Sequence, residues 1–313
     1  MDNLPLVTVL IATYNYEKYI GNAINSIIKQ DYPLEKIEII IIDDGSADNT
    51  KKVVEDFKNK INVTYVYQNN SGKASATTKG VQLASGKYLF VLDADDYYMP
   101  DCISTVVPYF ELNASVSQVS HLAYRLDEAT GVSTPQQLTH NEINEPKNGI
   151  YLLKKNIFKG FNVGLGSTFA ARTELLKKLA IPDDVDMYID YYLFLMMAAA
   201  GDIVQLDKLL SVFRRHSSSY SEGAVKLENN KNRSLRYLKS AKATSQACNE
   251  GNYDNIIKKY FKLFYYQHRV PALKYTNESR LKVDTTFLFL IFNLVWFYKN
   301  KARFLINNLK QLK

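Results

Sequence analysis

The 313-residue chain has few cysteines, no evident leader and no long hydrophobic run. Its two cysteines, Cys102 and Cys248, are too few for a disulfide scaffold or a multi-cysteine zinc site, and they suit a reducing compartment. No basic segment followed by an apolar run opens the chain, which argues against a secretory signal. The apolar run at residues 287–298, interrupted by Asn293, is too short to cross a bilayer alone. A hydrophobic content of 46% excludes a mainly disordered chain, so we expect a globular, cytoplasmic protein.

Positive charge is concentrated in the last third of the chain. Residues 223–313 hold 18 Lys and Arg against 5 Asp and Glu, whereas residues 1–222 hold 21 basic and 27 acidic side chains. This change predicts a domain boundary near residues 221–223, followed by a basic helical region. Its many aromatic side chains favour an anionic membrane surface over nucleic acid, which we do not expect as a partner. Packing of residues 285–298 on the preceding domain, or on a second copy of the chain in a homo-oligomer, remains an alternative.

The first third of the chain alternates short apolar strands with helices. Strands are predicted at residues 7–13, 37–42, 63–67 and 88–92, with helices at 19–28, about 46–60, and 73–84. Further on we expect strands at 117–125, 163–172 and 203–214, and helices at 173–179, 188–200 and beyond 223. The alternation predicts an α/β fold, with a Rossmann-like, mostly parallel sheet flanked by helices.

Two of the predicted strands end in clusters of aspartate. Asp43 and Asp44 follow the second strand, and Asp93-Ala-Asp95-Asp96 follows the fourth. In parallel α/β sheets, ligands bind outside the carboxyl ends of the strands. Clustered carboxylates repel one another unless a cation or a ligand offsets them, and Asp-x-Asp oxygens suit Mg²⁺ or Mn²⁺. Turn-forming aspartates would explain either cluster alone, but the two together favour a nucleotide-phosphate site.

These clusters belong to an ordered set of motifs. Over residues 5–220 the chain resembles the family 2 inverting glycosyltransferases of the GT-A fold, on the segments Thr13-Tyr14-Asn15, Asp43-Asp44-Gly45-Ser46, Asn70-x-Gly72, Asp93-Ala94-Asp95-Asp96, Gly166-Ser167-x-Phe169, Asp190 and Arg214-Arg215-His216. The resemblance implies a nucleotide-binding half at about residues 1–112 and an acceptor half at about 113–222, with residues 223–313 as a helical extension. It also implies transfer of a sugar, with inversion, from a nucleoside diphosphate donor to an acceptor hydroxyl.

The resemblance implies a role for each matching residue. Asp190 corresponds to the general base, which takes the proton of the attacking hydroxyl. Asp95 and His216 correspond to ligands of Mn²⁺ or Mg²⁺. Contacts to the donor, for which a UDP-sugar is favoured, fall to Thr13, Tyr14, Asn15, Asp43, Asp44, Lys73, Asp93, Asp95, Arg214 and Arg215. The Lys73 ammonium, beside free backbone N–H groups at a helix start, is a candidate clamp for the diphosphate, and an ordinary surface lysine is the alternative. Asp184 and Asp186 are nearby alternatives for the base, and ordinary packing remains an alternative for Tyr14.

Two departures from the family pattern bear on activity. Ile189 stands where most relatives have Glu, and Thr77 stands where many have Arg. They keep open a catalytically inactive relative that binds nucleotide sugar or polyanions. The first strand lacks the glycine-rich signatures of pyrophosphorylases and dehydrogenases. The chain also lacks the Gln-x-x-Arg-Trp motif of polymer synthases, which favours a non-processive enzyme of the bacterial surface-polysaccharide type. A saccharide or lipid-linked acceptor would make attachment to the inner face of the cell membrane useful.

Overall fold

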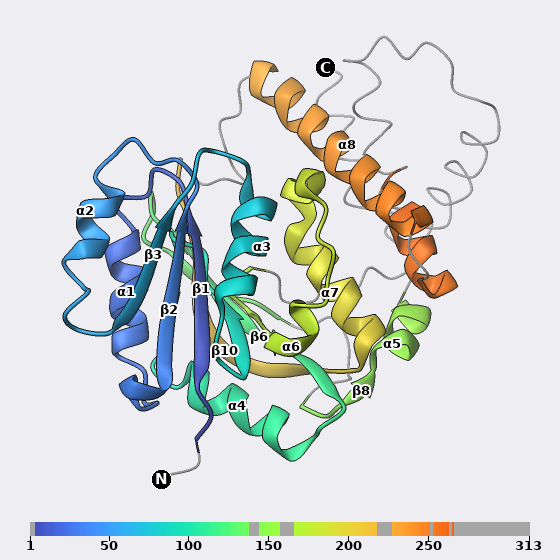
Figure 1. Cartoon of the computed structure of the whole chain (residues 1–313), viewed down its shortest axis with the longest axis horizontal. Helices are drawn as coiled ribbons and strands as arrows, with labels where there is room; N and C mark the ends of the chain where they lie inside the picture. Colours follow the sequence, from blue (N-terminus) through green and yellow to red (C-terminus); the bar gives the residue numbers. More distant parts are fainter. Residues whose placement is uncertain are drawn as a thin grey trace.

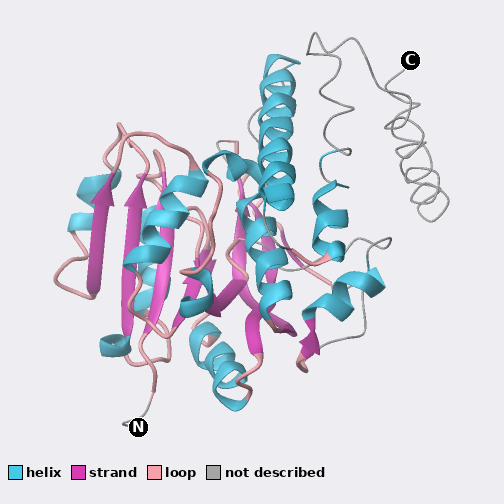
Figure 2. Ribbon diagram, turned by 45° about the vertical axis from the view of Figure 1, so that its right-hand side comes forward, coloured by secondary structure: helices cyan, strands magenta, loops and turns pink. Residues whose placement is uncertain are grey.

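The computed structural model describes residues 4–137, 144–156, 166–217, 227–250 and 253–262, and Tyr265. Within these ranges ten strands form one sheet, in the order β3-β2-β1-β4-β9-β6-β10-β5, with β7 paired to β6 and β8 to β10 (Figures 1 and 2). The strands are β1 (Val7–Thr13), β2 (Ile37–Asp43), β3 (Asn62–Tyr67), β4 (Tyr88–Val91), β5 (Tyr97–Tyr98), β6 (Val116–Asp127), β7 (Ser133–Pro135), β8 (Lys147–Asn148), β9 (Phe169–Arg172) and β10 (Asp202–Arg215).

Helices cover both faces of the sheet. They are α1 (Ile20–Ile28), α2 (Thr50–Glu55), α3 (Lys73–Leu83), α4 (Cys102–Leu112), α5 (Gly149–Asn156), α6 (Thr173–Leu176), α7 (Ile189–Ala200) and α8 (Leu227–Glu250), with 3₁₀ turns η1 (Leu34–Lys36) and η2 (Asp183–Tyr188). In Figure 1, α1 and α2 lie behind the strands at the left, whereas α3 and α7 lie toward α8.

Both aspartate clusters follow strands that belong to the parallel part of the sheet. β1 pairs in parallel with both β2 and β4, and β2 pairs in parallel with β3. β9 is antiparallel to β4 and β6, and so joins this part to the parallel pair of β6 and β10. The α/β fold with a mostly parallel sheet is therefore confirmed, with antiparallel β9 inside the sheet and antiparallel β5 at one edge.

Strands β1, β2 and β4 are largely apolar because both of their faces are buried. In β1, Val9 and Ile11 pack in the cluster that contains α1, α2 and α4, whereas Leu10 packs in the one that contains α3 and α7. This alternation follows from the two-residue period of a strand. Helix α3 comes so close that a Cβ on Gly80 would lie 2.1 Å from Leu10 Cδ1. A side chain at position 80 would therefore force the buried Leu10 side chain or α3 itself to shift.

Some boundaries differ from those predicted. Helix α4 was not predicted, and Pro108 lies inside it. Helix α2 ends at Glu55, before the predicted end near residue 60. Of the strand predicted at 163–172, residues 163–165 lie outside the described residues, and β9 covers Phe169–Arg172. Helix α8 is observed in the predicted helical region, but residues 266–313, with the apolar run and its membrane hypothesis, lie outside the described residues. Within the described parts of the chain, no helix is both long enough and apolar enough to span a bilayer.

Candidate active site

Asp43 and Asp44 lie at the carboxyl end of β2, where their side chains hold the neighbouring loops in place. Thr13, the last residue of β1, lies opposite Asp43 in the parallel register. Asp43 is fully buried and accepts hydrogen bonds from the Ser46 backbone N–H at 2.7 Å and from the Tyr65 hydroxyl. The Asp43 carboxylate therefore fixes the loop that follows β2.

Asp44 organises the loop that leads into α3. Its Oδ1 accepts hydrogen bonds from Gln68 Nε2 and the Ser71 N–H, each at 2.8 Å, and its Oδ2 accepts one from the Gly72 N–H at 2.8 Å. Gly72 has a φ of 91°, which favours glycine, and α3 begins at the next residue, Lys73. The Lys73 N–H donates to Asp186 Oδ1 at 2.8 Å. The expectation of free backbone N–H groups beside Lys73 is therefore wrong for residues 71–73, because carboxylates occupy all three.

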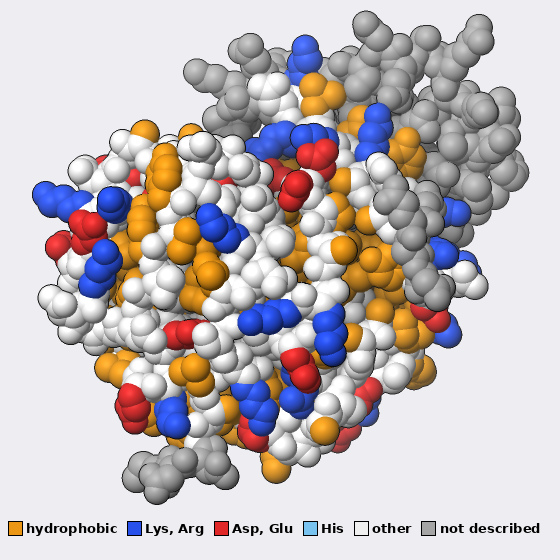
Figure 3. Space-filling view, in the orientation of Figure 1, with side chains coloured by type: hydrophobic (Ala, Val, Ile, Leu, Met, Phe, Trp, Pro, Cys, Tyr) orange, Lys and Arg blue, Asp and Glu red, His pale blue; other side chains and the backbone are white. Residues whose placement is uncertain are grey.

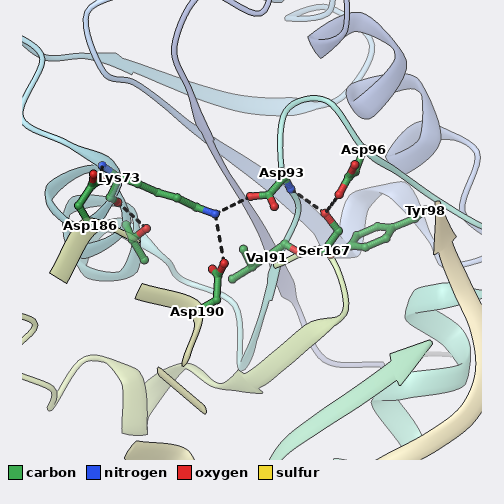
Figure 4. Close-up of polar contacts among 9 residues, drawn as sticks. Lys73, Val91, Asp93, Asp96, Tyr98, Ser167, Asp186 and Asp190 are labelled. Carbon is green, nitrogen blue, oxygen red and sulfur yellow. Dashed lines mark hydrogen bonds and ion pairs between the residues drawn. The ribbon is translucent and has the colours of Figure 1, made fainter. Parts of the chain in front are cut away.

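The Lys73 side chain joins two predicted site residues from distant parts of the chain. Its Nζ lies 2.9 Å from Asp93 Oδ1, after β4, and 3.4 Å from Asp190 Oδ2, in the first turn of α7 (Figure 4). The three side chains are 20–28% exposed, so they remain accessible from solvent. Burial raises the pKa of the Asp190 carboxyl above its usual value, and the Lys73 ammonium opposes that rise. Lys73, Asp93 and the proposed base thus form one cluster.

Gly166 and Ser167 both contact Asp93 and help to hold it in this cluster. Gly166 has a φ of 61°, and a Cβ there would lie 2.7 Å from Asp93 Oδ2. The Ser167 hydroxyl accepts a hydrogen bond from the Asp93 N–H at 3.0 Å and donates one to Asp96 Oδ2. Asp96 also accepts the Arg214 N–H at 2.9 Å, and burial, with its acidic neighbours, raises the pKa of Asp96 well above its usual value. Asp96 is therefore a support that joins the end of β10 to the loop after β4.

Asp95 and His216 lie together beside this support. His216 Nε2 is 3.1 Å from Asp95 Oδ2, and the imidazole stacks on the Tyr19 ring at a centroid distance of 4.2 Å. The Tyr19 hydroxyl donates to Glu128 Oε2 at 3.0 Å. Burial and the charge of Asp93 raise the pKa of Asp95. An Asp95 carboxylate held this way lacks full compensation and would be stabilised by a cation.

This pair fits a divalent metal whose coordination is completed by a ligand. Within the described ranges, no three His, Cys, Asp or Glu side chains converge as a site that protein groups alone could complete. A carboxylate oxygen and an imidazole nitrogen are nevertheless suitable ligands for Mn²⁺. Arg214, 5% exposed, donates from Nε to the Asp95 carbonyl, and its Nη2 is buried with no hydrogen-bond partner in the described part of the chain. An uncompensated carboxylate next to an unused cationic donor suits a metal with an anionic ligand.

The remaining predicted donor residues lie at the edges of the site. Tyr14 is 48% exposed at the end of β1, as a stacking platform requires. Asn15, with a φ of 57°, donates its N–H to Ser46 Oγ and accepts the Ala47 N–H with Oδ1, both at 2.8 Å. Arg215 is exposed at the end of β10. Its positive charge acts on Asp127, where it contributes to lowering the pKa of that carboxyl.

Several residues at the site went unassigned or were given another role. Asp186 was considered as a base, but its two oxygens bind the Lys73 N–H and the Arg236 guanidinium. Asp184 pairs with Lys239 at 2.7 Å. Gly166 and Ser167 were included in the motif Gly166-Ser167-x-Phe169 but were assigned no role from the sequence. That motif was the signal that could have identified them.

The order and geometry of these elements are those of the GT-A glycosyltransferases. TarS of Staphylococcus aureus, residues 1–349 in complex with UDP-GlcNAc, has this fold, with a TM-score of 0.58 and 18% identity over 90% of this chain and 77% of that chain. The mannosyltransferase PcManGT of Pyrobaculum calidifontis, in complex with GDP-Man and Mn²⁺, has a TM-score of 0.58 and 20% identity over 96% of this chain and 82% of that one.

Sequence comparison gives the family. The model of "Glycosyl transferase family 2" matches residues 8–180. The chain is 30% identical over 229 residues to an uncharacterized glycosyltransferase of Haemophilus influenzae, which covers 71% of this chain and 69% of that protein. It is 29% identical over 172 residues to TarS, a poly(ribitol-phosphate) β-N-acetylglucosaminyltransferase, over 54% of this chain and 28% of TarS. The chain belongs to glycosyl transferase family 2 and is an enzyme that transfers sugars.

Proposed function

We propose that the protein is a metal-dependent inverting glycosyltransferase with a nucleoside diphosphate sugar as donor. The observation that carries this proposal is the meeting of Asp190, Asp93 and Lys73 beside the Asp95–His216 pair. One part of the site offers a base, and the adjoining part offers ligands for a cation with a diphosphate. The complexes of TarS with UDP-GlcNAc and of PcManGT with GDP-Man and Mn²⁺ support a nucleotide-sugar donor. We favour a UDP-sugar.

Asp190 is the general base of this proposal. An inverting transfer requires one carboxylate that accepts the proton of the acceptor hydroxyl as the hydroxyl attacks the anomeric carbon. The raised pKa of Asp190 makes its carboxylate a stronger base, while the Lys73 ammonium 3.4 Å away favours the charged form. When a donor binds, the negative charge of its diphosphate could attract the Lys73 ammonium away from Asp190. The same lysine would then hold the base before the donor binds and contact the donor afterwards.

Asp95 and His216 would hold Mn²⁺ or Mg²⁺ in this proposal. The bound metal supplies positive charge that offsets the charge developing on the leaving diphosphate. The unused Nη2 of Arg214 could donate to an oxygen of the same diphosphate. Asp96 and Ser167 keep these groups in register through their hydrogen bonds with Arg214 and Asp93.

The nucleoside is assigned to the ends of β1 and β2. The exposed Tyr14 ring offers a face on which a base can stack. Thr13 and Asn15 flank that ring, and Asp43 and Asp44 shape the adjoining loops. Asp43 and Asp44 already accept hydrogen bonds from the chain, so their contribution to the donor is made through these loops or through remaining lone pairs.

The acceptor is proposed to be a saccharide or a lipid-linked sugar used in cell-surface polysaccharide or glycolipid synthesis. The net positive charge of residues 223–313 suits an anionic membrane, on the inner face of which the enzyme would act. Self-association through the C-terminal region is the competing proposal for these residues. Sedimentation of the full chain with anionic liposomes, or a dimer mass without them, decides between the two.

A donor screen tests the proposal. Nucleotide sugars are added to the full chain with Mn²⁺, Mg²⁺ or EDTA, and the melting temperature and release of nucleoside diphosphate are measured. We expect stabilisation by one donor class, its loss in EDTA, and a product of opposite anomeric configuration by NMR. A product that retains the donor's configuration would refute inversion. Donor binding with no transfer to any acceptor in the panel, or slow hydrolysis alone, would favour the inactive relative.

A further inference from the structure

Helix α8 docks on the domain through the short turn η2, which immediately precedes α7. Arg236 Nη2 lies 2.6 Å from Asp186 Oδ2, and Lys239 Nζ lies 2.7 Å from Asp184 Oδ1. The Met187 N–H also donates to Ser240 Oγ at 3.1 Å. Figure 1 shows α8 running beside the upper end of α7, and Figure 3 shows red and blue side chains next to one another in this region.

The two ion pairs of the junction differ in what lies behind them. Asp184 and Lys239 have side chains that are 53% and 67% exposed, so this pair lies at the surface. The Asp186 side chain is 20% exposed, and its second oxygen accepts the backbone N–H of Lys73 at 2.8 Å. Asp186 thus connects α8 to the first residue of α3, 113 positions away along the chain.

Asp186 acts as the N-terminal cap of α3 in place of a local side chain. The residue before the helix is Gly72, which has no side chain to accept the first N–H groups. A Cβ on Gly72 would lie 3.3 Å from Asp186 Oδ1, so the glycine leaves room for the carboxylate. A negative charge at a helix N-terminus is also favoured by the helix dipole. The start of α3 is therefore fixed by a residue of η2.

The residue held in this way carries the central ammonium of the site. From its capped backbone, the Lys73 side chain extends to Asp93 and Asp190 (Figure 4). Asp190 itself lies only four positions after Asp186, in the first turn of α7. A shift of η2 would move both the cap of Lys73 and the start of the helix that carries the base.

We propose that Asp186 is a positioning residue that couples the docking of α8 to the placement of Lys73 in the active site. The proposal rests on the function proposed above, because Lys73 matters there as the contact of both base and donor. Its consequence is that the basic C-terminal region is linked to catalysis. Any partner that pulls on α8 changes the Arg236–Asp186 contact, and through it the start of α3.

Four variants of the full chain test this coupling. Asp186→Ala removes both contacts, whereas Asp186→Asn keeps an oxygen for the Lys73 N–H and loses the charge that pairs with Arg236. Arg236→Gln removes the ion pair between α8 and Asp186 and leaves the Asp186 carboxylate in place for the Lys73 N–H. Lys239→Gln is the matched control, because it breaks the neighbouring ion pair on the same helix and leaves Asp186 intact.

Hydrogen exchange of the Lys73 amide is the first readout, and it does not depend on activity. We expect exchange about tenfold faster in Asp186→Ala, a smaller increase in Arg236→Gln, and wild-type exchange in Lys239→Gln. Rescue of protection by Asp186→Asn would show that the cap itself is responsible. Equal protection in Asp186→Ala and wild type, or equal loss in Arg236→Gln and Lys239→Gln, would overturn the proposal.

Donor kinetics provide the second readout. We expect kcat/KM about tenfold to a hundredfold lower in Asp186→Ala, and about two- to fivefold lower in Arg236→Gln, whose ion pair is partly exposed. Asp186→Asn should recover most of the loss, and Lys239→Gln should match wild type. If the wild-type chain transfers no sugar, the proposed function fails, whereas the exchange result still decides whether Asp186 holds Lys73. If transfer is normal in all four variants, the coupling is refuted and the function stands.

Discussion

Replacement of Asp190 by Asn separates a catalytic role from a structural one. The Asn side chain has nearly the same shape but cannot accept the proton of the acceptor hydroxyl. Since general base catalysis contributes about 10²- to 10⁴-fold to rates, we expect kcat to fall by that factor. Donor binding should persist, because Lys73 keeps its contact with Asp93 at 2.9 Å.

The structure also predicts that Asp190→Asn has little effect on folding. The attraction between Lys73 Nζ and Asp190 Oδ2 at 3.4 Å is about 5 kcal/mol at an effective dielectric constant of about 20. Burial opposes it strongly enough to raise the pKa of Asp190, so the carboxylate gains nothing net from ionisation at this place. A neutral amide should therefore change the free energy of unfolding by no more than about 1 kcal/mol, or about 2 °C in melting temperature.

The assay combines single-turnover transfer, donor titration and thermal unfolding of the same preparations. Asp184→Asn is the matched variant, because Asp184 is a nearby carboxylate that pairs with Lys239 at the surface. Undiminished transfer by Asp190→Asn, or loss of turnover in Asp184→Asn alone, would refute the assignment of the base. A melting temperature lowered by more than about 5 °C would refute the charge argument.

Three further predictions follow from other parts of the structure. Gly166→Ala should abolish transfer and cost about 1–3 kcal/mol of stability, because its Cβ would lie 2.7 Å from Asp93 Oδ2; Gly131→Ala, with a φ of 69° but no atom within 4 Å, is the control for backbone strain alone. Asp95→Ala should make donor binding weak and insensitive to EDTA in calorimetric titrations, and a response to EDTA equal to that of wild type would remove Asp95 from the proposed metal site. Burial lowers the pKa of His121 to about 4, whereas a histidine in the unfolded chain has its ordinary pKa of 6.5. Between these two values the unfolded chain binds more protons than the folded one, so stability is lost as pH falls from 6.5 toward 4. Between pH 7 and 5 this residue should account for about 2 kcal/mol, which urea unfolding of His121→Gln would show as a correspondingly flatter pH dependence.

The aspartates at the carboxyl ends of the strands could be predicted from the sequence, because both the strands and the aspartates are recognised from neighbouring residues. Strands buried on both faces appear as continuous apolar runs, and the aspartates stand directly after them. Parallel pairing then places these ends together without any knowledge of side-chain contacts. Helix α4 escaped prediction because Pro108 interrupts its pattern, although the helix accommodates it.

Contacts between distant segments were beyond sequence reasoning. A lysine after Asn-Ser-Gly gives a helix start with free N–H groups when only neighbouring residues are considered. The carboxylates that bind the N–H groups of residues 71–73 come from Asp44 and Asp186, on separate elements. The role of Asp186 depends on the meeting of η2 with α3, and no periodicity or motif in the chain encodes that meeting.

The balance of charge in the site bears on how the donor binds. Asp93, Asp95 and Asp96 follow β4 directly, and burial together with their mutual repulsion raises the pKa values of Asp95 and Asp96. The Lys73 ammonium lies 2.9 Å from Asp93 Oδ1. A diphosphate would add negative charge to a place where the existing carboxylates are already incompletely compensated. In the proposed site, donor affinity should therefore depend on divalent cation more steeply than on ionic strength, because a cation held by Asp95 would offset the negative charge of both the carboxylates and the diphosphate.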